Sequence, residues 1–270
     1  MTFPRCGKIR SYADCEGCSR EDCRKNRRDV IEAKEFQTTV NQAGLIKDKF
    51  LQMRSVALLC LLRLTGKRRG EIATVRLDDV KIENHLLSVT FSLEKKKRHF
   101  KRCPACNEKN TSRAMFCKEC GVSLETVEPQ STHKDTRATK DIPLNDPLTQ
   151  PIVKYIELLK ERPTIPKFLF PSTKSVFGQS YVILSDEHLK GRQVFNLIRN
   201  LSSEIWVHLF RETVGADIIK KDASIVGAFR VQRRLDLEDM KTGLRYLARY
   251  ANDVIMRSEL EAAQSTEVKT

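Results

Sequence analysis

The chain has 270 residues, of which 40% are hydrophobic and 31% charged, a balance that favours a folded chain with a core over global disorder. Its 49 Lys and Arg residues against 35 Asp and Glu give a net charge of +14, which favours a polyanion as partner. The longest apolar run, 56–62, is far shorter than the roughly 20 residues that cross a bilayer, and the N-terminus lacks the apolar stretch of a signal peptide. We therefore expect a cytoplasmic protein that neither spans a membrane nor is secreted.

The first half of the chain predicts two helices and then a small sheet. Apolar residues recur at helical spacing over 28–42 and 48–64, and Gly66 ends the second helix. Two strand-like runs follow at 80–82 and 86–93, and the second alternates apolar and polar side chains.

The second half begins with a basic run, 95–102, and a cysteine-rich unit, 103–122. We expect the polar stretch 125–140 to be a linker and 141–144 to be extended. The rest of the chain predicts helices over 152–160, 191–201, 208–220 and 237–256, with a short strand or turn at 167–171. Because helices precede and follow a small sheet, we predict a mostly helical α+β fold.

Two Cys-x-x-Cys pairs in the second cysteine-rich unit have the spacing of a zinc site. They are formed by Cys103, Cys106, Cys117 and Cys120, and the stretch resembles a zinc ribbon. Thiolates favour zinc, and four protein ligands leave no position for water, so we predict a structural zinc ion. The alternative is free cysteines at an accidental spacing.

Four further cysteines lie near the N-terminus, at Cys6, Cys15, Cys18 and Cys23. We interpret them as a second zinc site, although their spacing is looser. An iron–sulfur cluster and free surface thiols remain the alternatives, because four thiolates also serve a cluster. Cys60 lies inside the apolar run and is expected to be a small buried hydrophobe.

Four short segments carry residues suited to chemistry on a phosphate. They are Thr-Gly-Lys-Arg-Arg-Gly-Glu at 65–71, the lysines at 95–97, His-Leu-Phe-Arg at 208–211 and Lys-Thr-Gly-Leu-Arg-Tyr at 241–246. Each alone is common: an arginine can cap a helix, a lysine run is usually solvated, and a tyrosine at helical spacing is more often in the core.

In this order, the four segments resemble the catalytic domain of the tyrosine recombinase (phage integrase) family. The resemblance covers about 48–250, and flanking segments at 76–80, 141–144, 168–172 and 239–246 match as well. It implies a recombinase catalytic-domain fold with a small antiparallel sheet, into which the zinc ribbon is inserted.

The resemblance also implies a role for each residue. Tyr246 would attack the scissile phosphate and form a 3′-phosphotyrosyl link, which conserves the bond energy, so neither ATP nor a catalytic metal is required. Arg68 and Arg211 would bind the non-bridging oxygens, because a guanidinium is planar, charged and bidentate toward phosphate.

His208 would assist proton transfer or bind a phosphate oxygen. A lysine of the basic run would protonate the leaving 5′-oxygen. We favour Lys95, with Lys96 next, because strand alternation does not fix the register.

The chain departs from the family pattern in three ways. Leu237 stands where the family usually has His or Trp. Either Arg233 or Arg234 replaces that phosphate donor, or the site has one donor fewer and slower cleavage is expected. Tyr250 lies one helical turn after Tyr246 and is the alternative nucleophile. The family's usual N-terminal core-binding domain is missing before residue 48, so the DNA clamp would be incomplete or rebuilt from the two cysteine units.

We therefore predict a site-specific DNA recombinase or integrase that acts on double-stranded DNA, as a homo-tetramer when active. The alternative is a non-catalytic DNA-binding protein, a regulator or accessory factor on a degenerate recombinase scaffold; a zinc-ribbon adaptor is a third. The predicted units are a Cys-rich segment at 1–47, a catalytic domain at 48–256 interrupted by the ribbon at 103–122, and a polar tail at 257–270. The inserted ribbon is expected to add a DNA or partner contact, unless it is an inert decoration.

Overall fold

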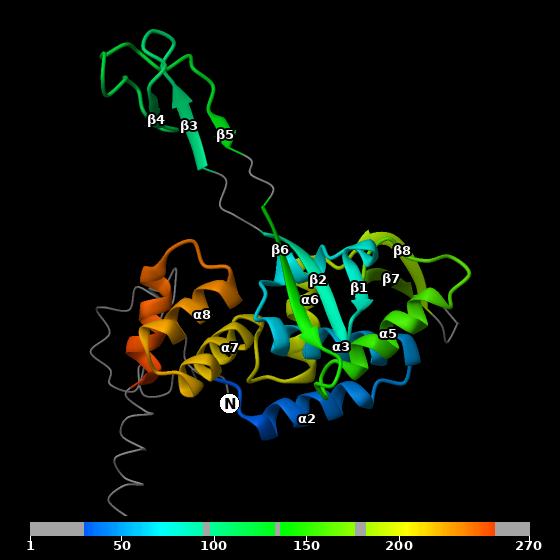
Figure 1. Ribbon diagram of the computed structural model, residues 1–270. Coiled ribbons are helices and arrows are strands. Elements are labelled where there is room, and N and C mark those ends of the chain that lie inside the picture. The colour runs from blue at the N-terminus through cyan, green and yellow to red at the C-terminus, as the bar shows by residue number, and fades with distance from the viewer. Residues whose placement is uncertain (1–29, 94–97, 133–135, 176–181, 252–270) are drawn as a thin grey trace, which may run out of the picture.

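A computed structural model of the protein describes residues 30–93, 98–132, 136–175 and 182–251 (Figure 1). Several predicted residues lie outside these ranges, namely Cys6, Cys15, Cys18, Cys23, Lys95, Lys96 and the tail 257–270. Within the described ranges, no helix is long and apolar enough to cross a membrane.

Helices form most of the body of the molecule. They are α2 (Ala33–Gly44), α3 (Lys49–Thr65), α4 (Arg69–Ala73), the short 3-10 helix η1 (Leu77–Asp79), α5 (Gln150–Lys160), α6 (Gly191–Leu201), α7 (Val207–Lys221), α8 (Ile225–Leu235) and a last helix at 240–251. The central α3 has signals at both ends that explain its bounds. Asp48 accepts a hydrogen bond from the Leu51 amide at 2.7 Å, and Gly66 ends the helix with φ 62°.

The main core surrounds α3, whose residues 57–62 are all buried. Helices α2, α5 and α7 pack against it. Residues 31–43 belong to this same core through Ile31, Phe36 and Ala43. A second, smaller core joins the last part of α7 to α8 and the 240–251 helix, so α7 carries residues of both cores.

A three-stranded antiparallel sheet lies on one side of the helices, in the order β1 (Val80–Glu83), β2 (Leu86–Leu93), β6 (Thr136–Pro143). The alternation along β2 buries Leu87, Val89 and Phe91, as the sequence predicts. The expectation that 125–140 is a linker is wrong at its end, because Thr136 already pairs with Leu93. Half of the eight residues of β6 are exposed, and one of its two buried residues is Lys140, so its sequence lacks the apolar signal of a strand.

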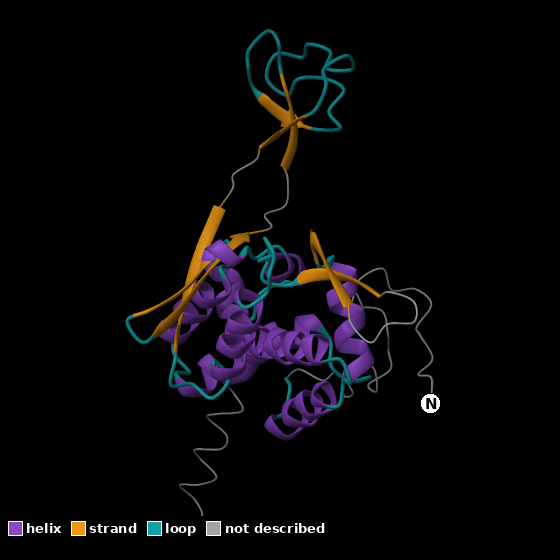
Figure 2. Cartoon of the chain, turned by 90° about the vertical axis from the view of Figure 1, so that its right-hand side faces the viewer, coloured by secondary structure: helices purple, strands orange, loops and turns teal. Residues whose placement is uncertain are grey.

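The hairpin formed by β2 and β6 leads into a separate knob (Figures 1 and 2). In the knob, β3 (Arg98–Arg102) pairs with β4 (Lys109–Thr111) on one side and β5 (Gln130–Thr132) on the other. Its small core consists of Cys103, Cys117 and Leu124. The sequence predicts the cysteine unit but not these strands. A further two-stranded hairpin, β7 (Pro171–Ser175) and β8 (Val182–His188), lies on the body.

These elements confirm the mostly helical α+β prediction, with small antiparallel sheets and an inserted Cys-rich unit.

Candidate active site

Arg68 is placed by the tight turn between α3 and α4. Gly66 is in the left-handed region, and a Cβ there would lie 2.6 Å from a Leu235 side-chain carbon, so the turn requires glycine. Arg68 then caps α4, and both its backbone N–H and its Nη1 donate to the carboxylate of Glu71, at 3.0 and 2.7 Å. Glu71 is buried whereas Arg68 is 44% exposed at its side chain, so a buried anion holds the guanidinium at the surface.

His208 and Arg211 lie one turn apart on α7 and differ sharply in environment. The His208 side chain is exposed, whereas Arg211 is only 4% exposed. Arg211 donates through Nη1 to the Gly66 carbonyl at 2.9 Å and through Nη2 to the Leu235 carbonyl. Burial lowers the pKa of Arg211, and the positive charge of Arg68 lowers it further. Arg211 is therefore fixed where α3 and α8 end.

A cavity of about 350 Å³ brings these three predicted residues together. It is lined by Lys67, Arg68, Arg69, Phe195, Trp206, Val207, His208 and Arg211. Four of these side chains are cationic and none is a carboxylate, so the cavity suits an anionic group such as a phosphate. A larger, more open cavity of about 580 Å³, lined by residues of α2, α3 and α6 among others, has none of the predicted catalytic residues in its wall.

Tyr246 lies beside this cavity, although it is not part of its wall. Its ring packs against Gly215 of α7, where a Cβ would approach Tyr246 Cε1 to 2.3 Å. Its hydroxyl donates to Glu212 Oε1 at 3.3 Å. Tyr246 is 7% exposed, and burial, followed by the charge of Glu212, raises the pKa of the phenol well above its usual range. Tyr250 packs against it, with ring centroids 6.1 Å apart.

Leu237 is partly buried against the smaller core and offers no donor to a phosphate. The two arginines that would have to replace it do not line the cavity. Arg234 donates to the Leu64 carbonyl at 2.6 Å, at the end of α3. Arg233 is exposed at its side chain.

A buried ionic cluster beside the site was not predicted from the sequence. Lys67 is fully buried, and its Nζ lies 2.5 Å from Asp236 Oδ2 and 4.5 Å from the centroid of the Phe91 ring. Lys140, on β6, binds the other oxygen of Asp236 at 2.9 Å and the Arg233 carbonyl at 2.7 Å. The sequence held no signal for this cluster, since Lys67 looks like one more basic residue of a basic turn.

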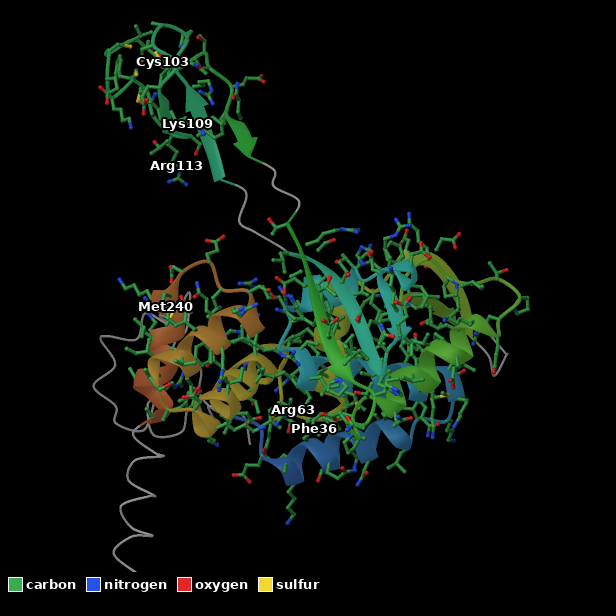
Figure 3. All side chains as sticks on the ribbon, viewed as in Figure 1. Phe36, Arg63, Cys103, Lys109, Arg113 and Met240 are labelled. Carbon is green, nitrogen blue, oxygen red and sulfur yellow. The ribbon has the colours of Figure 1, made fainter. Side chains whose placement is uncertain are left out.

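The four cysteines of the knob form a compact group. Their sulfurs lie within 4.8 Å of one another, with Cys103 and Cys120 at 3.4 Å and Cys106 and Cys117 at 3.5 Å. Four sulfurs bound to one zinc ion at about 2.3 Å would be about 3.8 Å apart, so this set fits a tetrahedral ion such as zinc. Figure 3 shows Cys103 in the knob, well separated from Met240 and Arg63 of the body.

The Cys117 sulfur also has features of a ligand. Asn110 Nδ2 lies 3.5 Å from it, and N–H groups of the knuckle backbone lower the pKa of the Cys117 thiol to about 6. Metal ligands of this type are thiolates with such outer hydrogen bonds.

No protein-family model matches the sequence, and no curated protein matches it either. Solved structures do resemble the fold. XerH site-specific recombinase bound to its difH substrate before cleavage has a TM-score of 0.52 at 13% identity, over 81% of this chain and 50% of that one. The XerH complex with palindromic difH after cleavage has a TM-score of 0.53 at 12% identity, over 91% and 55%. XerA recombinase has a TM-score of 0.48 at 14% identity, over 82% and 59%.

This chain therefore spans about half the length of the XerH chains it resembles. The likeness concerns the fold, and it agrees with the order of motifs in the sequence. The chain has a recombinase fold, structurally similar to XerH over most of its length, with a four-cysteine unit inserted in it.

Proposed function

We propose that this chain is a site-specific DNA recombinase that breaks and rejoins strands through a 3′-phosphotyrosyl intermediate. The observation that supports it best is the cationic cavity, in which Arg68, His208 and Arg211 meet, with Tyr246 beside it. Neither the fold nor a basic surface alone distinguishes an enzyme from a DNA-binding protein.

In the proposed reaction, Arg68 and Arg211 bind the non-bridging oxygens of the scissile phosphate. Loss of one such preorganised donor typically costs about 10²–10³ in rate. Tyr246 attacks phosphorus, and His208 binds a phosphate oxygen or helps to move a proton. A lysine of the basic run, Lys95 or Lys96, protonates the leaving 5′-oxygen; both lie outside the described residues. No ATP is consumed, because the phosphotyrosyl bond retains the energy needed for rejoining.

The partner of this reaction is double-stranded DNA, and the active form is a homo-tetramer that holds two duplexes. The XerH chains with this fold are bound to difH DNA substrates. A net charge of +14 supports the same partner for this chain. If several of its cations contact phosphates, affinity should fall on the order of 10³-fold or more between 50 and 200 mM salt.

The zinc ion is proposed to be structural. Bound to four thiolates, it would cross-link the knob and leave no open position for catalysis. The core of the knob is only Cys103, Cys117 and Leu124, with two partly buried neighbours, so the knob depends on the metal for its fold. Because the knob lies at the end of the β2–β6 hairpin, we propose that it adds a contact with DNA or with a partner protein.

One observation favours the second candidate, a DNA-binding protein without strand exchange. The apolar Leu237 packs into the smaller core where a phosphate donor is expected, and Arg234 is already bonded to the Leu64 carbonyl. The site would then bind a phosphate without cleaving beside it.

Covalent trapping separates the two candidates. Purified protein is mixed with nicked duplexes, made from DNA flanking its gene, in which the cleaved fragment diffuses away, and denaturing gels then reveal a covalent adduct. An adduct that is lost in Tyr246→Phe and kept in Tyr250→Phe supports the recombinase and its nucleophile. Salt-sensitive DNA binding without an adduct, on two independent sets of sites, refutes the enzyme and supports the DNA-binding alternative.

A further inference from the structure

The carboxylate of Glu212 contacts both the phenol of Tyr246 and His208, a residue of the cavity wall. Its Oε1 accepts hydrogen bonds from Tyr246 Oη at 3.3 Å and from His208 Nε2 at 3.0 Å. Arg249, on the same helix as Tyr246, lies 3.6 Å from Oε2. The four side chains belong to α7 and the 240–251 helix, and the Glu212 side chain is 19% exposed.

We propose that Glu212 is a further catalytic residue, whose carboxylate orients the Tyr246 hydroxyl and accepts its proton as that oxygen attacks phosphorus. The inference rests on the proposed recombinase function and adds to it a residue that the motifs do not include. Glu212 lies one turn after His208 on α7, so its side chain contacts both this residue of the cavity wall and Tyr246.

The reaction requires such an acceptor, because a neutral phenol is a weak nucleophile. Burial raises the pKa of the Tyr246 phenol, so the phenol is still protonated when the attack on phosphorus begins. For Glu212, burial also favours the protonated form, but the hydrogen bond and charge of His208, together with Arg249 and Tyr246, outweigh it and hold the pKa below its usual range. The carboxylate is therefore ionised at neutral pH, which is the form that accepts a proton.

The proposed step balances without any co-reactant. The Oη–H bond of Tyr246 breaks, its proton goes to Glu212 Oε1, and the oxygen forms a bond to phosphorus. The bond from phosphorus to the 5′-oxygen breaks, and a separate acid protonates that oxygen. In rejoining, the 5′-hydroxyl gives its proton to the conjugate base of that acid, and its oxygen forms a bond to phosphorus. The bond from phosphorus to Tyr246 Oη breaks, and Glu212 returns the proton to Oη.

The simpler reading is that Glu212 is only structural. An i,i+4 pair between a histidine and a glutamate on a helix surface and a hydrogen bond to a tyrosine each stabilise a fold modestly. A structural residue would change stability, but it would not change how the rate depends on the leaving group or on an added base.

The test is single-turnover cleavage of two nicked duplexes, one with the natural 5′-oxygen and one with sulfur in its place. A thiolate leaves without protonation, so the sulfur substrate rescues variants that lack the acid and does not rescue variants that lack the base. Glu212→Gln is expected to slow cleavage of both substrates by about 10²-fold or more, with unchanged DNA affinity. Glu157→Gln, at an exposed position of α5, is the matched control and should cleave like the unmodified chain.

Chemical rescue covers the case in which the glutamine variant folds poorly. Glu212→Ala is expected to regain cleavage when formate is added, whereas Tyr246→Phe is not. Cleavage by Glu212→Gln within twofold of the unmodified chain, rescue by the sulfur substrate, or no response of Glu212→Ala to formate would overturn the proposal. Absence of an adduct in the unmodified chain would refute the recombinase function itself, which is a separate outcome.

Discussion

Replacing Lys67 by methionine tests how much the buried ion pair beside the candidate site stabilises the fold. Lys67 is fully buried, and its ammonium contacts Asp236 at 2.5 Å, while Lys140 contacts the other carboxylate oxygen at 2.9 Å. Methionine has a similar length and no charge, so Lys67→Met removes the ion pair and leaves little cavity.

The expected loss is large for a single substitution. Breaking a buried ion pair by removing one partner costs about 3–5 kcal/mol, whereas a whole domain is stable by about 5–15 kcal/mol. Lys67→Met should lie at the low end of that range, because Lys140 still pairs with Asp236. Asp236→Gly should cost a similar amount, since it leaves Lys67 charged and buried without its carboxylate. Part of this loss is offset, because Asp236 has φ 49° and glycine adopts that conformation at a gain of about 1 kcal/mol.

The double variant isolates the interaction between Lys67 and Asp236 from the other effects of each substitution. With both groups removed, no unpaired ammonium remains at position 67, and Lys140 keeps its bond to the Arg233 carbonyl at 2.7 Å. Lys67→Met/Asp236→Gly should therefore be more stable than the sum of the single losses predicts, with a coupling free energy of about 2–3 kcal/mol.

Urea unfolding of the zinc-loaded chain, followed by circular dichroism, measures all three losses. Lys160→Met, at an exposed position of α5, is the control and should change stability by less than about 0.5 kcal/mol. The reasoning is refuted if Lys67→Met costs less than about 1 kcal/mol, or if the two single effects simply add.

Three further predictions follow from other parts of the molecule. Gly215→Ala should destabilise the protein by about 1–3 kcal/mol and abolish the covalent adduct, because the new Cβ would lie 2.3 Å from Tyr246 Cε1. Gly44 has open space around it, so Gly44→Ala is the neutral control in the same unfolding and trapping assays. Cys117→Ser should lower bound zinc, measured by metal analysis, and expose the knob to protease while the helical signal of the body persists; loss of the whole fold would contradict this. The pKa of Glu212 is lowered in the folded state, so its ionised form stabilises the protein above about pH 4.3, and this stabilisation is lost as the pH falls below that value. In Glu212→Gln, the free energy of unfolding should therefore fall less steeply with decreasing pH in this range. The same steepness in both proteins would contradict the pKa argument.

Local signals explain which elements the sequence predicts. The helix expected at 48–64 is found at Lys49–Thr65, because its cap at Asp48 and its stop at Gly66 are encoded within a few residues. The strand expected at 86–93 is found there, because one face is buried and alternation reports it. Helix α8 was not predicted. It buries Val231 and Leu235 besides two small residues, while Ile225, Val226 and Phe229 are exposed. Its apolar residues therefore lie on both its buried and its exposed face, so they do not mark a single core-facing stripe.

For the candidate site too, the sequence predicts the residues that belong to local motifs and misses contacts between distant segments. The order of motifs selects Arg68, His208 and Arg211, and the structure places all three in one cavity wall. Whether they and Tyr246 perform the proposed reaction stays a prediction. The contacts of Glu212 with Tyr246 and of Lys67 with Asp236 join residues far apart in the chain. These contacts depend on which side chains the fold buries together, and the residue types alone do not show this.

Two buried cations and the partly buried Arg234 explain how the 240–251 helix is positioned although Leu237 supplies no phosphate donor. Arg211 bonds to the Leu235 carbonyl at the end of α8, Lys67 bonds to Asp236 one residue later, and Arg234 of α8 bonds to the Leu64 carbonyl. These contacts fasten the end of α8 to the turn that carries Arg68. The 240–251 helix begins just after this point, so its start is fixed without help from residue 237. Residue 237 therefore supplies no phosphate donor, but other residues hold the start of the 240–251 helix in place. For this reason we expect slower cleavage and not a displaced Tyr246.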